Sequence, residues 1–273
     1  IICSNIWDHI DNNKLLSDAQ HGFRKGFSTT TQLLHVVHNA TEALDKNASY
    51  HIVSFDFAKA FDKVPHDLLL LKLRAYKIDK QACDWIESWL TNRVSVVSAN
   101  GQRSDEFQVL SGVPQGSVLG PVLFLLFIED MPHSIKHSDC RLYADDTLLC
   151  CKNSSQVQLQ EDVTSLVHWS EKWGMTFNPT KCSHMEVGKL TPQYSVQIND
   201  VPIPHTDHLK YLGLTISHDM KWKTHIANIT KKANRQLGML KRHISDAPSK
   251  TKLTAFNAIV RTTLEYASQV WSP

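Results

Sequence analysis

The sequence has few cysteines, and none of them form a metal-binding pair. Its six cysteines, in 273 residues, include no Cys-x-x-Cys pair, the spacing typical of structural zinc sites. They are also too few for a disulfide-stabilised scaffold, so the composition indicates a reducing, intracellular compartment. With only ten glycines and ten prolines, the chain is neither collagen-like nor of low complexity.

Long apolar runs are absent as well. The longest, 118–128, has eleven residues, whereas about 20 are needed to cross a bilayer. We therefore expect a buried helix there and no membrane span. Polar residues from Asp8 to Asn12 interrupt any signal-peptide core. The first residue is Ile1 rather than Met, so we expect the chain to be part of a longer protein.

Positive charge is concentrated near the C-terminus. Lysine and arginine total 29 against 27 acidic residues, a net charge of +2, so the chain as a whole is not basic. Residues 221–261 hold ten of the basic residues and one acid, Asp246, which makes that stretch +9 and the rest −7. This asymmetry predicts a segment that meets an anionic partner.

Hydrophobic periodicity predicts a chain of mixed helices and strands. Asn100-Gly101 between two apolar runs predicts a β-hairpin. From Thr29 the period is helical, and it predicts one buried face formed by Leu33, Leu34, Val37 and Leu44. We expect helices over 1–16, 29–44, 65–73, 83–90, 118–128, 157–173, from 222 onward and over 251–266, with strands over 51–57, 94–97, 107–110, 141–151 and within 175–187 and 194–216.

Aspartates occur at two places beside apolar, strand-like segments. Asp56 follows the run 51–55, and Asp145-Asp146 interrupts the run 141–151. A carboxylate in apolar surroundings is costly without a cation or a hydrogen-bond donor, and adjacent aspartates in a tight turn repel each other. Two Mg²⁺ ions about 3.5–4 Å apart, held by these carboxylates and by substrate phosphates, would relieve both costs. Taken singly, each point has a simpler explanation: a hairpin turn for Asp145-Asp146 and a helix cap for Asp56.

Six motifs in one order resemble those of reverse transcriptases. Tyr143-Ala144-Asp145-Asp146 is similar to the metal-binding box of that family, and Asp56 followed by Phe61 to its first metal-binding motif. The loop 112–121, Gly-Val-Pro-Gln-Gly-Ser-Val-Leu-Gly-Pro, resembles the nucleotide-pocket loop; 211–214 resembles the primer-grip turn, and 173–181 the motif before it. Residues 21–29 and 59–66 point to non-LTR retrotransposons, LINE-like and jockey-like. The resemblance covers nearly all of the chain.

The resemblance implies an α+β right-hand polymerase: truncated fingers over 1–50, an antiparallel-sheet palm over 51–218 and the start of a helical thumb over 219–273. The implied activity is RNA-directed DNA synthesis, with two Mg²⁺ ions, or Mn²⁺ in their place, assisting the addition of dNTPs to a primer 3′-OH. The implied partners are an RNA template, a DNA primer and dNTPs, with no membrane. The implied location is intracellular, and nuclear for an active element. Since the family's triphosphate-binding finger strands would precede Ile1, we expect this chain alone to bind duplex in a salt-dependent manner and to extend primers poorly.

The same resemblance gives roles to individual residues. Asp56, Asp145 and Asp146 would be the catalytic metal ligands, joined by the backbone carbonyl of Phe57, and Lys181 would protonate the leaving pyrophosphate. The ring of Phe61 would pack under the deoxyribose and exclude a 2′-OH. The remaining roles are nucleotide binding by Phe57, Gln115, Gly116, Tyr143, Ala144 and Arg24, and template–primer binding by Tyr211, Leu212, Gly213, Lys231, Lys232, Arg235, Lys241 and Arg242.

Simpler alternatives stand beside these roles. They are core packing for Phe61, a solvated surface side chain for Lys181, an ordinary loop role for Gly112 and Pro114 and a solvated charged face for the basic helices. A viral RNA-dependent RNA polymerase is one alternative function, but such enzymes usually place an acid five residues after the first metal ligand, where this chain has Phe61. An inactive or domesticated RNA-binding remnant is another, and the three intact aspartates argue against decay of the site. An endonuclease domain would lie outside this segment.

Overall fold

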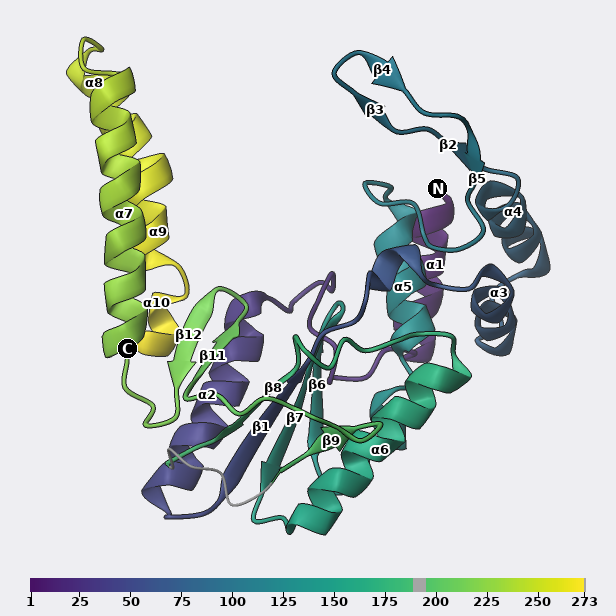
Figure 1. The fold of residues 1–273 in the computed structure, drawn as a ribbon. Helices are drawn as coiled ribbons and strands as arrows, with labels where there is room; N and C mark the ends of the chain where they lie inside the picture. The colour runs from purple at the N-terminus through teal and green to yellow at the C-terminus, as the bar shows by residue number, and fades with distance from the viewer. Residues whose placement is uncertain (189–194, 273) are drawn as a thin grey trace.

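A four-stranded antiparallel sheet lies at the centre of the molecule (Figure 1). The structure, a computed structural model, describes residues 1–188 and 195–272. Its sheet has the strand order β6-β7-β1-β8, and all its pairs are antiparallel. The strands are β1 (Tyr50–Phe55), β6 (Asp139–Tyr143), β7 (Asp146–Lys152) and β8 (Ser183–Glu186). Tyr194, where the sequence predicts that a further strand region begins, lies outside the described residues.

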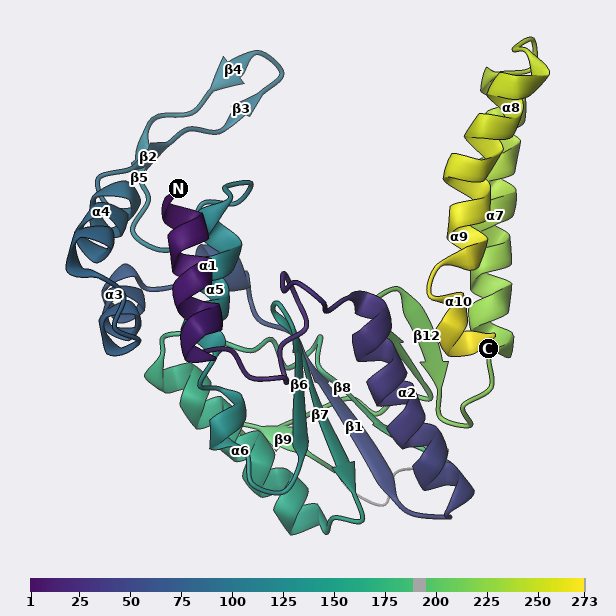
Figure 2. The ribbon, with the colours of Figure 1, turned by 180° about the vertical axis from the view of Figure 1, so that it is seen from behind.

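Helices cover both faces of this sheet (Figures 1 and 2). Since alternate strand residues point to opposite faces, Ile52 and Leu148 pack with α2 (Thr29–Asp45), while Val53 and Leu149 pack with α6 (Gln156–Lys172). Serines begin both helices through capping boxes, Ser28 for α2 and Ser155 for α6.

The predicted buried face of α2 is wrong at one position. Leu33, Val36, Val37 and Ala40 are buried, but Leu34 is 42% exposed. Successive residues of a helix lie about 100° apart around its axis. Leu34 therefore falls outside the stripe that meets the sheet, although it is as apolar as its neighbour.

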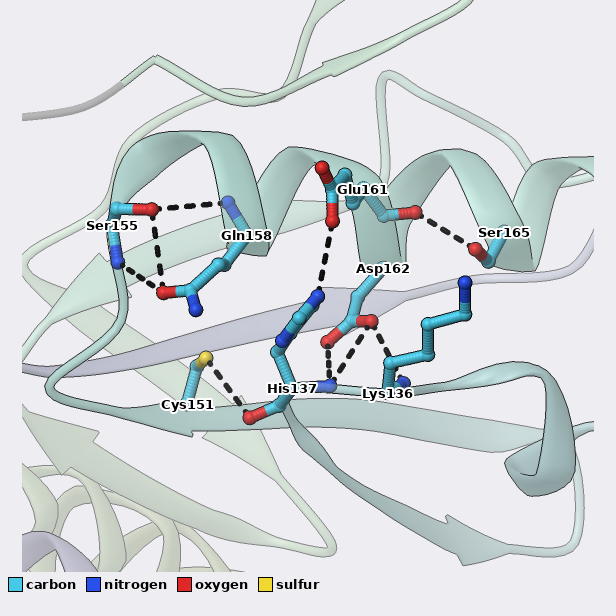
Figure 3. A network of polar contacts seen from close by, with 8 residues as sticks. All are labelled: Lys136, His137, Cys151, Ser155, Gln158, Glu161, Asp162 and Ser165. Atoms are coloured by element: carbon cyan, nitrogen blue, oxygen red, sulfur yellow. Dashed lines mark hydrogen bonds and ion pairs between the residues drawn. The ribbon is translucent and has the colours of Figure 1, made fainter.

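A buried aspartate attaches α6 to the segment that leads into β6 (Figure 3). The carboxylate of Asp162, 1% exposed, accepts backbone N–H bonds from Lys136 at 3.0 Å and from His137 at 3.1 Å. The His137 ring also meets Glu161, with 3.0 Å between Nε2 and Oε2. These bonds fix the end of β6 that lies away from its turn with β7.

A second layer of helices lies beside the sheet. The apolar helix α5 (Leu119–Ile128) is buried on nearly all sides, as its composition predicts, with α1 (Ile2–Asn13) and α3 (His66–Ala75) packed against it. Beyond α4 (Lys80–Leu90), the chain forms a hairpin arm with its turn at Asn100 and Gly101, whose φ angles are +51° and +78°, confirming the predicted turn. The arm contains β2 (Val94–Ser95), β3 (Ser98–Ala99), β4 (Gln102–Arg103) and β5 (Phe107–Gln108). Two short 3₁₀ helices lie outside the arm, η1 (Ala60–Asp62) and η2 (Pro132–Ser134).

The C-terminal part stands away from the sheet as a helical arm (Figures 1 and 2). A small hairpin, β11 (His208–Tyr211) with β12 (Leu214–Ser217), leads into the long helix α7 (Lys223–His243). The chain then returns through α8 (Ser249–Ala255), the π-helical η3 (Phe256–Arg261), α9 (Thr262–Glu265) and α10 (Ser268–Trp271). Of these, η3 and α9 pack along α7, and α10 packs against α2. The pair β9 (Gln197–Ile198) and β10 (Val201–Pro202) precedes the hairpin.

No helix within the described residues is long and apolar enough to cross a membrane.

Candidate active site

The sheet brings the three predicted aspartates to one end. β1 pairs with β7 so that Phe55 faces Thr147, and the same register continued by one residue places Asp56 opposite Asp146. Tyr143 pairs with Asp146 across β6 and β7, so Ala144 and Asp145 form a two-residue turn between them. The strand pairing therefore unites carboxylates that lie far apart in the sequence.

The pKa values of Asp145 and Asp146 are raised in the folded chain. Desolvation is the main cause that raises the pKa of Asp145, and the charge of Asp56 adds to it. The pKa of Asp146 is raised to about 6, first by desolvation and then by the charges of Asp145 and Asp56. The turn therefore carries negative charge that the protein's own groups do not fully compensate.

One carboxylate oxygen of Asp56 accepts no hydrogen bond within the described residues, although a lysine forms an ion pair with it. Oδ2 of Asp56 is shielded from solvent and accepts no hydrogen bond from the part of the chain that the structure describes. Burying an ionised oxygen in this way is unfavourable unless a cation is present. The nearby cation of the chain is Lys181, whose Nζ lies 3.5 Å from this oxygen.

This donor set fits a divalent metal ion. Carboxylate oxygens are the ligands that Mg²⁺ prefers, and Mg²⁺ at polymerase sites completes its shell with water and substrate phosphates. Among the described residues, no three His, Cys, Asp or Glu side chains converge closely enough to form a metal-binding group by themselves. The three aspartates would thus supply part of a coordination shell rather than a closed cage.

Lys181 lies beside the aspartates because its segment is attached to the end of β1. Ala58 N–H donates to Thr176 O at 2.8 Å, and Asn178 N–H donates to Asp56 O at 2.8 Å. The side chain of Lys181 is 65% exposed. A surface lysine in this position can reach a bound phosphate as well as Asp56, and its role as proton donor stays a prediction.

The glycine-containing loop packs over the segment that carries Phe61. Val113 N–H donates to Phe61 O at 2.8 Å and Gly112 N–H to Val64 O at 2.8 Å, while Gln115 Nε2 donates to Asp62 Oδ1 at 2.8 Å. Gly112 has φ +89°, and a Cβ there would lie 2.6 Å from Asp62 O. Only glycine permits this close backbone approach, so the packing of the loop is sufficient to explain Gly112.

Gln115 and Gly116 are at the exposed side of this loop. A Cβ at Gly116 would meet no atom within 4 Å, although its φ of +80° favours glycine. The surface above Gly116 is open to a ligand, and nucleotide binding by these two residues stays a prediction.

Phe61 is anchored in the core and still partly exposed. Its ring stacks on Phe124, with centroids 4.2 Å apart and planes at 21°, and Phe124 is fully buried in α5. One face of the ring is thus fixed by core packing, which is the support that a rigid steric gate requires. Selection against a 2′-OH by Phe61 stays a prediction.

Two predicted nucleotide-binding side chains are engaged elsewhere. The ring of Phe57 is 6% exposed and stacks on Phe177 at 4.3 Å, which leaves its backbone carbonyl as the group that could serve the site. Arg24 donates to Ser17 O and to Gln20 O, and its guanidinium lies 4.4 Å from the Phe27 ring centroid. A contact between Arg24 and a triphosphate would have to replace these bonds.

The turn between β11 and β12 is held by the helical arm. Tyr211 pairs with Leu214, and the turn residues Leu212 and Gly213 have φ +43° and +87°, as in a type I′ hairpin. Tyr266 O–H donates to Leu212 O at 2.9 Å, and a Cβ at Gly213 would lie 3.0 Å from its ring. The sequence offered no sign that Tyr266 supports this turn.

The Tyr211 side chain points into the core rather than toward a ligand. The residue is 3% exposed, and its hydroxyl accepts a hydrogen bond from Gln32 Nε2 at 3.1 Å. Desolvation raises its pKa above the usual range. Its predicted part in primer binding could therefore be played only through the backbone and through support of the turn. A buried glutamine inside the apolar pattern of α2 was the only sequence signal for this contact.

Basic residues of α7 face the same hollow as this turn. The hollow has a volume of about 700 Å³, and Lys231, Lys232 and Arg235 line it together with Gly213 and Tyr266. Lys241 and Arg242 are exposed farther along the helix, toward its C-terminal end. The structure thus joins three of the five predicted basic residues to the turn and leaves two beyond it.

Two solved telomerase structures share this architecture. A telomerase from Candida tropicalis in complex with a TWJ fragment of telomeric RNA matches with a TM-score of 0.59 at 15% identity, covering 98% of this chain and 46% of that one. An apo telomerase from Candida tropicalis matches with a TM-score of 0.55 at 12% identity, over 100% of this chain and 50% of that one. The predicted right-hand polymerase fold is confirmed.

Residues 1–216 match the family described as "Reverse transcriptase (RNA-dependent DNA polymerase)", and the chain belongs to this family. It is 32% identical, over 277 residues, to the RNA-directed DNA polymerase from mobile element jockey of Drosophila melanogaster, covering 96% of this chain and 30% of that protein. The Drosophila funebris counterpart is 30% identical over 288 residues, with 99% and 31% covered. The predicted likeness to jockey is confirmed, and the chain spans less than a third of the length of these relatives.

Proposed function

We propose that this chain is the catalytic part of an RNA-directed DNA polymerase of a non-LTR retrotransposon, which adds dNTPs to a primer 3′-OH on an RNA template. In this proposal residues 1–50 belong to the fingers, 51–218 to the palm and 219–273 to the thumb. Reverse transcriptases use divalent metal ions, and we propose that two Mg²⁺ ions serve here. The observation that carries the proposal is the meeting of Asp56, Asp145 and Asp146 at one end of the sheet, where the chain leaves their charge incompletely compensated.

Asp56, Asp145 and Asp146, with the carbonyl of Phe57, would hold the metal ions. Bound Mg²⁺ would lower the pKa of the primer 3′-OH and neutralise charge on the transferring phosphate and the pyrophosphate. Lys181, 3.5 Å from Asp56 Oδ2, would donate a proton to the leaving pyrophosphate. Phe61, held by Phe124, would limit the space beside the 2′ carbon of the incoming sugar.

The helical arm would hold the template–primer duplex. Lys231, Lys232 and Arg235 line a hollow that also contains the turn residue Gly213. Lysine and arginine that neutralise backbone phosphates give binding without sequence preference that weakens with salt. Tyr266, bonded to Leu212, would keep the primer-contacting turn in register with this basic face.

The test is single-nucleotide extension of a DNA primer on an RNA template by a chain extended upstream of Ile1, with enzyme in excess and Mg²⁺ present. Asp145→Asn relieves repulsion within the turn, so we expect the fold to be retained. Because it also removes the charge of one metal ligand, the extension rate should fall by at least 100-fold. Asp67→Asn is the matched control, because Asp67 is an exposed carboxylate in the first turn of α3. Extension by Asp145→Asn within tenfold of the parent would refute the metal assignment. Duplex binding without extension by the parent would leave only the RNA-binding remnant.

A further inference from the structure

Gln20 contacts both backbone groups of the turn residue Ala144. Its side-chain Oε1 accepts the N–H of Ala144 at 2.9 Å, and its Nε2 donates to the carbonyl of Ala144 at 3.4 Å. The same Oε1 accepts the N–H of Gly22 at 2.7 Å. The residue is 1% exposed, so these bonds are made away from competing water.

The segment around Gln20 lies along β6 as an additional strand-like edge. Leu142 N–H donates to Ala19 O at 2.8 Å, and His21 N–H donates to Leu142 O at 2.9 Å. Gln20 and Leu142 form a parallel bridge. The backbone of this segment is therefore fixed to the strand that ends in the aspartate turn, and its side chain extends from a rigid position.

Gly22 lets the two backbones touch. A Cβ at Gly22 would lie 2.4 Å from the nitrogen of Ala144 and 3.0 Å from Gln20 Oε1. Real Cβ atoms do not approach a backbone nitrogen this closely, so any side chain here would displace the turn. Gln20 thus supplies the hydrogen bonds to Ala144, and Gly22, two residues later, leaves the space that the Ala144 backbone occupies.

The turn requires such support for two reasons. Ala144 has φ +53°, the left-handed region that residues with a Cβ seldom occupy without compensation. The next two residues are Asp145 and Asp146, whose charges and that of Asp56 repel one another. A neutral amide provides an acceptor and a donor together, whereas a glutamate would add a fourth negative charge to this end of the sheet.

We propose that Gln20 is a positioning residue, which holds the Ala144 peptide so that the Asp145 carboxylate faces the metal ions. This inference rests on the proposed function. It predicts that loss of the Gln20 amide weakens metal binding more than it weakens the fold, because the contact ends directly at the residue before Asp145.

Gln20→Met tests the proposal, since methionine has nearly the same length but neither the acceptor nor the donor. The control is Asp162→Asn, which alters another buried acceptor of backbone N–H groups at the opposite end of β6 (Figure 3). Hydrogen exchange of the segment 142–147 reports the Ala144 amide, and the EPR signal of free Mn²⁺ reports metal binding by the 273-residue chain. We expect exchange at Ala144 at least tenfold faster and Mn²⁺ affinity three- to tenfold weaker in Gln20→Met, with neither change in Asp162→Asn.

Gly22→Ala is a second variant, which displaces the turn from the other side and should weaken Mn²⁺ binding similarly; it decides the matter if Gln20→Met does not fold. Unchanged Mn²⁺ affinity in a folded Gln20→Met chain, or equal loss in Asp162→Asn, would overturn the positioning role. The proposed function fails separately, if Asp145→Asn binds Mn²⁺ as the parent does.

Discussion

Replacing Phe61 by valine should relax the choice between deoxyribonucleotides and ribonucleotides. The ring is fixed by Phe124, 4.2 Å away, so valine leaves a space that the neighbours cannot easily fill. A pocket that loses several CH₂ groups changes discrimination by about 1–3 kcal/mol, or about 10–200-fold. Phe61 is partly exposed and valine keeps part of its volume, so the accompanying loss of stability should be about 1–2 kcal/mol, below the cost of truncating a fully buried phenylalanine.

The assay compares single-nucleotide incorporation of a dNTP and the matching rNTP under enzyme excess, and the measured quantity is the ratio of their kcat/KM values. Phe124→Leu should give a smaller change in the same direction, because it removes the support behind the gate. Phe127→Leu is the matched control. It lies on the same helix, is also fully buried and packs edge-on against Trp173 instead. An unchanged ratio in Phe61→Val, or an equal change in Phe127→Leu, would show that Phe61 is only part of the core.

Two further predictions concern charge. The pKa of Asp146 is raised to about 6, so its ionised form is disfavoured in the folded state without metal. At pH values above 6, Asp146→Asn should therefore have a higher Tm than the parent. This gain in Tm should disappear as the pH falls toward 4. A Tm difference independent of pH between 4 and 8 would contradict this sign. The double variant Lys231→Ala/Lys232→Ala should reduce the slope of log K against log salt for an RNA–DNA duplex by up to about 1.8, the value for two phosphate contacts. Lys136→Ala, on the surface beside α6, should leave the slope unchanged, and equal slopes in all three proteins would exclude these lysines from the interface.

Some of these features could be predicted from the sequence because they depend on neighbours along the chain. Asn100-Gly101 specifies its hairpin, since both residues tolerate positive φ. The apolar run of α5 is buried on nearly all sides, as its lack of polar positions requires. The adjacent Asp145 and Asp146 indicate a site for a cation, because two carboxylates in one turn are unfavourable alone.

Only the tertiary structure determined which distant residues meet. The pairing of β1 with β7 places Asp56 opposite Asp146, and no local pattern specifies that register. The contacts of Gln20 with Ala144 and of Tyr266 with Leu212 join segments that are 124 and 54 residues apart in the sequence. The exposure of Leu34 was likewise decided by where α2 meets the sheet. Local propensities act over a few residues, whereas burial and hydrogen bonding of a side chain depend on surfaces that exist only once the chain has folded.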